Sequence, residues 1–143
     1  MNRFQRLVEL RKIREESAAD AFARAQGRIQ KNLDEMATLD RETESEKQSA
    51  KENLVSGCTI PPQMYENFFR GQVFRKLRLE ERQSRLQAEA EVARRAWLGA
   101  RTLLEQAKKL AEKDDKLKAA SERRKESKEM DMVGILGVQH SGS

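Results

Sequence analysis

Residues 56–62 read Ser-Gly-Cys-Thr-Ile-Pro-Pro, and they form the only clear interruption in a chain that otherwise favours helix. Glycine readily ends a helix, because it adopts the left-handed conformation of a C-terminal cap without steric cost. Pro61 and Pro62 cannot continue a helix, but proline is favoured in the first turn of a new one. We therefore predict two helices that are joined by a turn at about residues 55–62.

The stretch after the turn carries the strongest periodic signal in the chain. Apolar and aromatic residues recur there at alternating spacings of four and three, the heptad spacing of a left-handed coiled coil. The predicted seam consists of Tyr65, Phe69, Gln72, Lys76, Leu79, Gln83, Leu86, Ala90, Ala93, Trp97, Ala100, Leu104, Ala107 and Ala111. Only Gln72, Lys76 and Gln83 interrupt its apolar character. We expect this seam to face a partner helix.

The stretch before the turn also fits a helix. When residues are placed 100° apart, most apolar side chains between Phe4 and Leu39 fall within about half of the circumference. Helix-compatible polar residues continue to Leu54, so we expect this helix to reach about residue 55. A short break between two long helices favours an antiparallel pair. The predicted fold is all-α, an antiparallel coiled-coil hairpin over residues 1–131.

Charge and size suggest a register for this hairpin. If the numbers of facing residues sum to about 117, bulky Trp97 faces the small residues Ala18 and Ala21, which favours dense packing. The same register aligns four opposite-charge pairs, which are Glu9–Lys108, Glu16–Arg101, Glu35–Arg82 and Glu42–Arg75. A register displaced by one heptad stays open.

This register leaves the end of the second helix without a partner. Residue 116 meets Met1, so the chain from Leu117 to Met130 would extend as a single helical overhang. The following segment, residues 132–143, has no helical periodicity and ends in small polar residues. We expect it to be a disordered tail.

Composition excludes several classes of protein. The chain has 143 residues, of which 37% are hydrophobic and 37% charged, and this leaves too few large apolar side chains for a sizeable globular core. No apolar run approaches the roughly 18 residues of a membrane span. The first 16 residues are too charged for a signal peptide, so we expect a cytosolic protein. Cys58 is the single cysteine, which excludes an internal disulfide and a cysteine-built zinc site.

The sequence contains no constellation typical of catalysis. It lacks a glycine-rich phosphate loop followed by Lys-Ser/Thr. His140 is the single histidine and lies in the expected tail, so no nucleophile is positioned beside a base. We expect a non-enzymatic chain with no cofactor, no metal site and no small-molecule substrate.

Aromatic residues gather just after the turn. Tyr65 and Phe69 belong to the seam, where core packing explains them. Phe68, Val73 and Phe74 fall at the margin of the seam or on the outer face of the helix. Exposed aromatic residues near the end of a helical hairpin suggest a docking patch.

Basic residues are concentrated in the second helix. Residues 55–111 contain 11 basic and 6 acidic groups, and this difference accounts for the whole formal charge of +5. The densest part contains Arg70, Arg75, Lys76, Arg78, Arg82 and Arg85. In heptad terms these side chains occupy several faces, and no aromatic platform accompanies them. We therefore do not expect nucleic-acid binding, which would place cations along one face.

Two segments resemble those of a known family. The opening Phe4-Gln5-Arg6-Leu7-Val8-Glu9-Leu10-Arg11, with Glu15-Glu16 and an alanine-rich run after it, resembles the start of FliJ-family proteins, coiled-coil components of the flagellar type III export apparatus. The similarity continues at Tyr65-Glu66-Asn67-Phe68-Phe69 and covers residues 4 to about 131. Val133-Gly134 departs from the family, whose members often continue the helix there. Stalk proteins of virulence type III systems look similar.

The resemblance implies a stalk in the central hole of a hexameric export ATPase. It also implies contacts with the membrane-embedded export gate and with export chaperones, at the cytoplasmic face of the inner membrane at the flagellar base. On this basis we expect one set of residues to contact the ATPase, namely Phe4, Leu7, Arg11, Leu117, Arg123 and Arg124. We expect a second set to contact the gate or the chaperones, namely Phe68, Val73 and Phe74.

Other functions stay open at this point. The chain could be a structural coiled coil, a prefoldin-like holding chaperone or a virulence type III stalk. It could also be a self-dimerising coiled coil in which Gln72, Lys76 and Gln83 set the register. A nucleic-acid-binding protein is a further alternative, and its affinity would depend steeply on salt.

Overall fold

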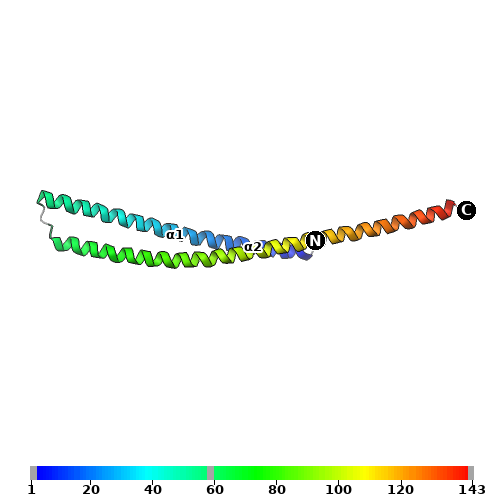
Figure 1. Cartoon of the computed structure of the whole chain (residues 1–143), viewed down its shortest axis with the longest axis horizontal. Coiled ribbons are helices and arrows are strands. Elements are labelled where there is room, and N and C mark those ends of the chain that lie inside the picture. Colours follow the sequence, from blue (N-terminus) through cyan, green and yellow to red (C-terminus); the bar gives the residue numbers. More distant parts are fainter. Residues whose placement is uncertain (1–2, 58–59, 142–143) are drawn as a thin grey trace. The chain divides into compact units, whose positions relative to one another are not determined.

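The computed structural model describes residues 3–57 and 60–141, and the surroundings of the side chains up to Ile135. Its elements are two helices, α1 (Arg3–Ser56) and α2 (Pro62–Ser141) (Figure 1). The fold class predicted from the sequence is confirmed, because the two helices pack against each other as a hairpin and the described residues contain no strand.

The connection between the helices follows from its glycine and prolines. Gly57 has a φ of 74°, the left-handed conformation that ends α1. A β-carbon at this position would meet no atom within 4 Å, so the demand for glycine is conformational and not one of space. Pro62 opens α2, and the backbone N–H of Met64 donates to the carbonyl of Pro61 at 3.0 Å. Cys58, one of the predicted turn residues, lies outside the described residues.

The chain divides into two compact units. The turn unit is Ala18–Trp97, and the terminal unit combines Met1–Ser17 with Leu98–Ser143. Each unit contains a stretch of α1 and a stretch of α2, and in the turn unit the two stretches run antiparallel on either side of the connection (Figure 1).

In the turn unit α1 has its own heptad seam, where the sequence predicts only a broad apolar face. The buried and half-buried positions of α1 are spaced by four and three, as in α2. They include Ala18, Phe22, Ala25, Ile29, Asn32, Met36, Leu39 and Thr43. The polar members Asn32 and Thr43 obscure this pattern in the sequence.

The predicted α2 seam is buried or half-buried with one exception. Gln72, Gln83 and Ala90 are buried in the turn unit, and Leu104, Ala107 and Ala111 are buried in the terminal unit. Tyr65, Phe69, Leu79, Leu86, Ala93, Trp97 and Ala100 are half-buried. The exception is Lys76, whose side chain is 50% exposed because its ammonium group pairs with Asp40 at 3.4 Å.

Contacts across the seam establish the register of the turn unit. Arg82 Nη1 lies 3.1 Å from Glu35 Oε2, one of the four charge pairs predicted from the sequence. The side chain of Gln72 donates to the Thr43 hydroxyl at 3.1 Å. The residue numbers of these pairs sum to 117 and 115, so in this unit the predicted register is confirmed and a one-heptad slip is excluded.

The other predicted charge pairs have a different outcome. Arg75 Nη1 donates to Gln72 Oε1 at 2.6 Å, so this guanidinium group is engaged on its own helix. In the terminal unit Glu9 and Lys108 line one groove, but Lys108 pairs with Glu105 at 3.5 Å. The Glu42–Arg75 and Glu16–Arg101 pairs stay predictions.

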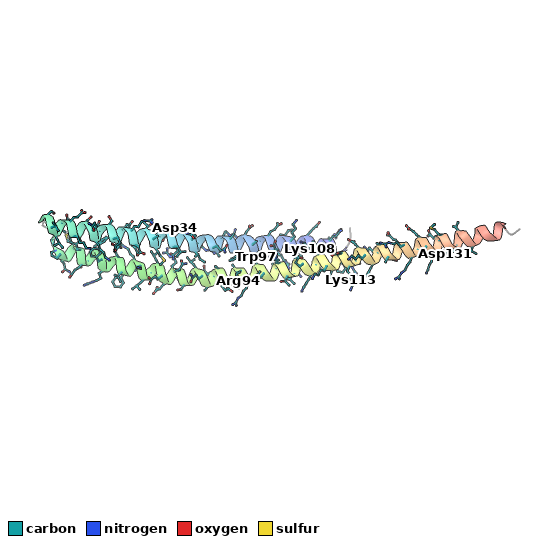
Figure 2. The ribbon with its side chains drawn as sticks, turned by 45° about the horizontal axis from the view of Figure 1, so that its top comes forward. Asp34, Arg94, Trp97, Lys108, Lys113 and Asp131 are labelled. Atoms are coloured by element: carbon teal, nitrogen blue, oxygen red, sulfur yellow. The ribbon has the colours of Figure 1, made fainter. Side chains whose placement is uncertain are left out.

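Trp97 has a larger neighbour than the sequence suggested. Its ring stacks on that of Phe22 with centroids 5.8 Å apart, on the side of α2 that faces α1 (Figure 2). In the predicted register only the small residues Ala18 and Ala21 lie opposite Trp97. The difference arises because Phe22 occupies a seam position of α1, one turn from Ala18.

A polar layer crosses the middle of the turn unit. The amide nitrogen of Asn32 donates to Gln83 Oε1 and to the backbone carbonyl of Leu79, each at 2.9 Å. Asn32 is 2% exposed and Gln83 is 9% exposed, so water does not compete for these bonds. Buried amides of this kind favour one register over its neighbours, because any slip leaves them unpaired.

In the terminal unit α2 continues past the stretch that lies beside α1 (Figure 1). Ala111 lines a groove with Gln5 and Val8, whereas every residue from 121 to 135 is exposed. Residues 132–141, for which the sequence predicts a disordered tail, instead continue α2. Gly134 and Gly137 weaken a helix by about 1 kcal/mol each, but no proline is present to end it. Residues 142–143 lie outside the described residues.

Removing one member of the buried amide pair should destabilise the hairpin more than removing both. Asn32→Leu is expected to lower the free energy of unfolding by about 1–3 kcal/mol, because it leaves Gln83 buried without its partner. The double variant Asn32→Leu/Gln83→Leu should lie within about 1 kcal/mol of the wild type. Urea unfolding followed by circular dichroism measures both. Additive losses would show that the two amides do not act as a pair.

Phe22→Ala tests the aromatic stack. We expect a loss of about 2 kcal/mol, below the 3–5 kcal/mol typical of fully buried aromatic residues, because Phe22 is only half-buried. Trp97 is the only tryptophan, so its fluorescence reports unfolding directly. The matched control is Phe74→Ala, whose side chain is 62% exposed and whose loss should cost less than about 0.5 kcal/mol. Equal effects of the two substitutions would contradict the stacking role of Phe22.

Candidate functional site

The helix pair of the turn unit carries a groove on each side of its seam. One groove has an apolar floor and mixed charges along its edges, and its lining is Lys31, Asp34, Glu35, Thr38, Leu39, Glu42, Arg75, Arg78, Leu79 and Arg82. The other groove is lined by Leu39, Asp40, Thr43, Glu44, Lys47, Phe69, Gln72, Val73 and Lys76. Both are open to solvent along the surface, so they suit a protein segment better than a small substrate.

Part of the basic cluster gathers on one face of the helix pair, which the sequence did not predict. Arg75, Arg78 and Arg82 line the same groove, whereas Lys76 lines the opposite one. Within the first groove Arg82 is paired with Glu35. The cluster as a whole therefore occupies more than one face, as predicted, but three of its arginines share a single face together with acidic residues of α1.

The aromatic residues after the turn divide into a packed group and an exposed group. The ring of Phe68 meets that of Phe69 edge-on at 5.3 Å, and Phe69 stacks on Tyr65 at 6.5 Å. Phe68 is half-buried, and its expected contact with the gate or the chaperones stays a prediction. Phe74 and Val73 are 62% and 59% exposed.

Leu77 joins this exposed group, although it was not among the residues predicted from the sequence. Its side chain is 50% exposed, and it follows Val73 by four residues and Phe74 by three, so the three lie on one outward face of α2. We call Val73, Phe74 and Leu77 the turn patch. Leu77 lies four residues after Val73 and three after Phe74, and this helical spacing could have identified it from the sequence.

The residues expected to contact an ATPase all lie in the terminal unit. Phe4, Leu7 and Arg11 of α1 are half-buried, and the guanidinium group of Arg3 lies 4.8 Å from the centre of the Phe4 ring. Leu117 of α2 is 61% exposed. Arg123 and Arg124 are also exposed, on the part of α2 that extends beyond the helix pair (Figure 2 labels Asp131 on the same stretch). The α1 set is therefore partly covered by α2, and the α2 set is free for contact.

The electrostatics of the described residues are those of an exposed helix surface. Arg94 donates two hydrogen bonds to Glu91, at 2.7 and 2.9 Å, and Arg95 donates a third at 3.1 Å. These bonds, chiefly those from Arg94, lower the pKa of the Glu91 carboxyl to about 2. Glu91 therefore stays ionised at neutral pH, as an ion-pair acceptor and not as a general acid.

The described residues offer neither a metal site nor a membrane span. No group of three or more His, Cys, Asp or Glu side chains converges among them. In the same part of the chain, no helix combines the length and the apolar character needed to cross a bilayer. What the arrangement can do is present side chains along two helices to other proteins.

Comparison with known proteins assigns the chain to a family. The family model described as "Flagellar FliJ protein" matches residues 1–142. No curated protein and no solved structure matches the chain significantly. Because the family match spans nearly every residue, the resemblance inferred from the two segments of sequence is confirmed. The chain therefore belongs to the FliJ family, whose members are non-enzymatic coiled-coil components of flagellar protein export.

Proposed function

We propose that this chain is the stalk of the flagellar export machinery and binds within the central hole of the hexameric export ATPase. The observation that supports this proposal is the pairing in the terminal unit, where the start of α1 lies beside α2 and α2 continues beyond it. A single exposed helix next to a helix pair is narrow enough to enter a ring of subunits. In this position Phe4, Leu7, Arg11, Leu117, Arg123 and Arg124 contact the ATPase.

The stalk would act by asymmetry and not by chemistry. A hexameric ring presents six similar subunits, but a single pair of helices presents a different set of side chains to each of them. Each ring subunit would therefore bind the stalk with a different free energy. Such differences favour ring assembly and couple ATP turnover to the sequential rearrangement of the subunits.

The turn patch is the proposed contact with the membrane-embedded export gate or with export chaperones. Its three apolar side chains are all at least half exposed, and Phe74 offers an aromatic anchor of the kind enriched at binding hot spots. This assignment places the protein in the cytoplasm, at the inner face of the membrane below the flagellum.

Deletion of residues 117–143 tests the ring contact. We expect the truncated chain to lose most of its stimulation of the export ATPase, because Leu117, Arg123 and Arg124 are removed. The measurement is ATP hydrolysis by the purified export ATPase with and without the chain. Circular dichroism verifies that the hairpin still folds. Unchanged stimulation would remove the assignment of this end to the ring.

Alanine substitution of Val73, Phe74 and Leu77 tests the turn patch. We expect affinity for the cytoplasmic domain of the export gate to fall about tenfold or more, since each truncated hot-spot side chain costs about 1 kcal/mol or more. The matched control is Val92→Ala, which removes an equally exposed side chain (69% exposed) elsewhere on α2. Binding that survives the triple substitution would show that the gate binds elsewhere on the chain.

A further inference from the structure

The terminal unit carries a second heptad repeat on α2, beside its buried seam. Gly99, Leu103, Gln106, Leu110, Lys113 and Leu117 are separated by alternating steps of four and three. The leucines recur every seven residues, and they are 41%, 45% and 61% exposed along the chain. A seven-residue apolar repeat on an exposed helix face has the period of a coiled-coil contact, although no residue that the structure describes covers it.

The repeat occupies one defined flank of the helix pair. Leu103 and Leu110 each directly precede a buried seam residue of α2, Leu104 and Ala111. In the turn unit, residues that precede seam positions on the two helices meet in one groove, as Glu35 and Arg82 do. The seam thus places residues that precede it on one flank of both helices.

The opposite flank of the terminal unit is independently identified. Gln5, Glu9 and Lys108 each directly follow a seam position and line one groove. On α1, Leu7 and Leu10 directly precede the seam positions Val8 and Arg11, so they lie on the same flank as the α2 repeat. We call this surface the leucine flank, and it consists of Leu7, Leu10, Leu103, Leu110 and Leu117.

The two flanks of the terminal unit differ in charge. The charged residues interspersed with the leucine flank are all cations, namely Arg3, Arg14 and Lys113 (Lys113 is labelled in Figure 2). Arg14 and Lys113 form no ion pair within the described part of the chain. The other flank carries five acidic residues, Glu9, Glu16, Glu105, Glu112 and Asp115, together with the cations Lys12, Arg101 and Lys108. An apolar surface bordered only by cations complements a partner that is apolar with acidic borders.

The combination of leucines and cations favours one of three candidate binding partners, which are a second copy of the chain, a membrane and a helix of another protein. A second copy of the chain, joined symmetrically through the same flank, would bring the cations of the two copies together. Binding to an anionic membrane would be stabilised by only about 1 kcal/mol for each of the three cations. A flat lipid surface also gives no reason for the leucines to recur every seven residues. A partner helix with an apolar heptad repeat would match the spacing of the leucines, and acidic residues along its edges would match the cations.

We propose that the leucine flank binds an acidic amphipathic helix of a partner protein, which packs along α1 and α2 as a third strand of the coiled coil. Leucine-type residues of the partner would pack against the exposed leucines of α1 and α2. Its glutamates or aspartates would pair with Arg14 and Lys113. The inference rests on the proposed function for Leu7 and Leu117, which belong to the expected ATPase contact, and it adds the chemistry of the bound segment.

A designed peptide tests this chemistry with the full-length chain. The probe is a helical peptide of about three heptads with leucine at the seam positions and glutamate at the bordering positions. We expect Leu103→Gln/Leu110→Gln to weaken its binding about tenfold or more, measured by fluorescence anisotropy. The matched control is Ile13→Gln/Leu98→Gln, which also removes two exposed apolar side chains of the terminal unit, from outside the flank (64% and 38% exposed). The control should change the affinity less than about twofold.

Charge reversal provides the second arm of the experiment. Arg14→Glu/Lys113→Glu should weaken binding of the glutamate peptide and strengthen binding of a matched lysine peptide. An unchanged preference would overturn the proposed charge complementarity. Equal loss in the flank variant and in the control variant would overturn the assignment of the flank.

Two further measurements exclude the other occupants. Sedimentation of the wild type that reveals a dimer, abolished by Leu103→Gln/Leu110→Gln, would replace the partner helix with a second copy. Flank-dependent binding to phosphatidylserine-containing vesicles, without binding of the peptide, would replace it with a membrane. The peptide assay contains no export ATPase, so its failure overturns this inference alone. Unchanged ATPase stimulation after deletion of residues 117–143 overturns the ring contact alone.

Discussion

The contact between α1 and α2 depends on a seam of small and polar side chains. Among the described residues, the buried members of the seam are mostly alanines and side-chain amides, and only Leu39 and Leu104 are large apolar residues. Alanines bring two helices close together but bury little apolar area, and a small buried area gives little hydrophobic free energy. The amide pair of Asn32 and Gln83 then matters more for register than for the total stability, since a slipped pairing would leave both groups buried and unsatisfied.

A thin seam also determines where large apolar side chains are found. Most of the leucines, valines and phenylalanines outside the seam lie on the outer faces of the helices. They include the exposed turn patch and the leucine flank, in which all but the half-buried Leu7 are exposed. A monomeric protein rarely exposes contiguous apolar surface without a use for it. Partners that cover such surfaces bind the folded chain and not the unfolded one, so they supply free energy that the seam lacks. The same property that makes the hairpin weak makes it suited to work inside an assembly.

Much of this fold could be predicted from the sequence, and the exceptions have physical causes. The α2 seam was evident because its heptad residues are nearly all apolar, and Gly57 with the prolines marked the turn. The α1 seam was not recognised because the polar residues Asn32 and Thr43 occupy two of its positions and interrupt the apolar repeat. The stacking of Phe22 on Trp97 depends on the rotation of α1, which only its complete heptad pattern defines. Helix continues through residues 132–141 because glycine weakens a helix without forbidding it.

Surfaces were harder to predict than the seam, since periodicity alone does not distinguish an outward repeat from an inward one. Leu103, Leu110 and Leu117 obey the same spacing as the seam, but each lies one residue before it. An offset of one residue corresponds to a rotation of 100° about the helix axis, so these leucines lie on one flank of the seam. The charged residues on that flank are all cations. The other flank holds five acidic residues of the paired stretch, and one of them, Glu9, lines a groove with Lys108. A helix pair with leucines and cations on one flank and mixed charges on the other has two chemically different faces, and a partner helix with acidic borders is attracted more strongly to the face that has no carboxylates.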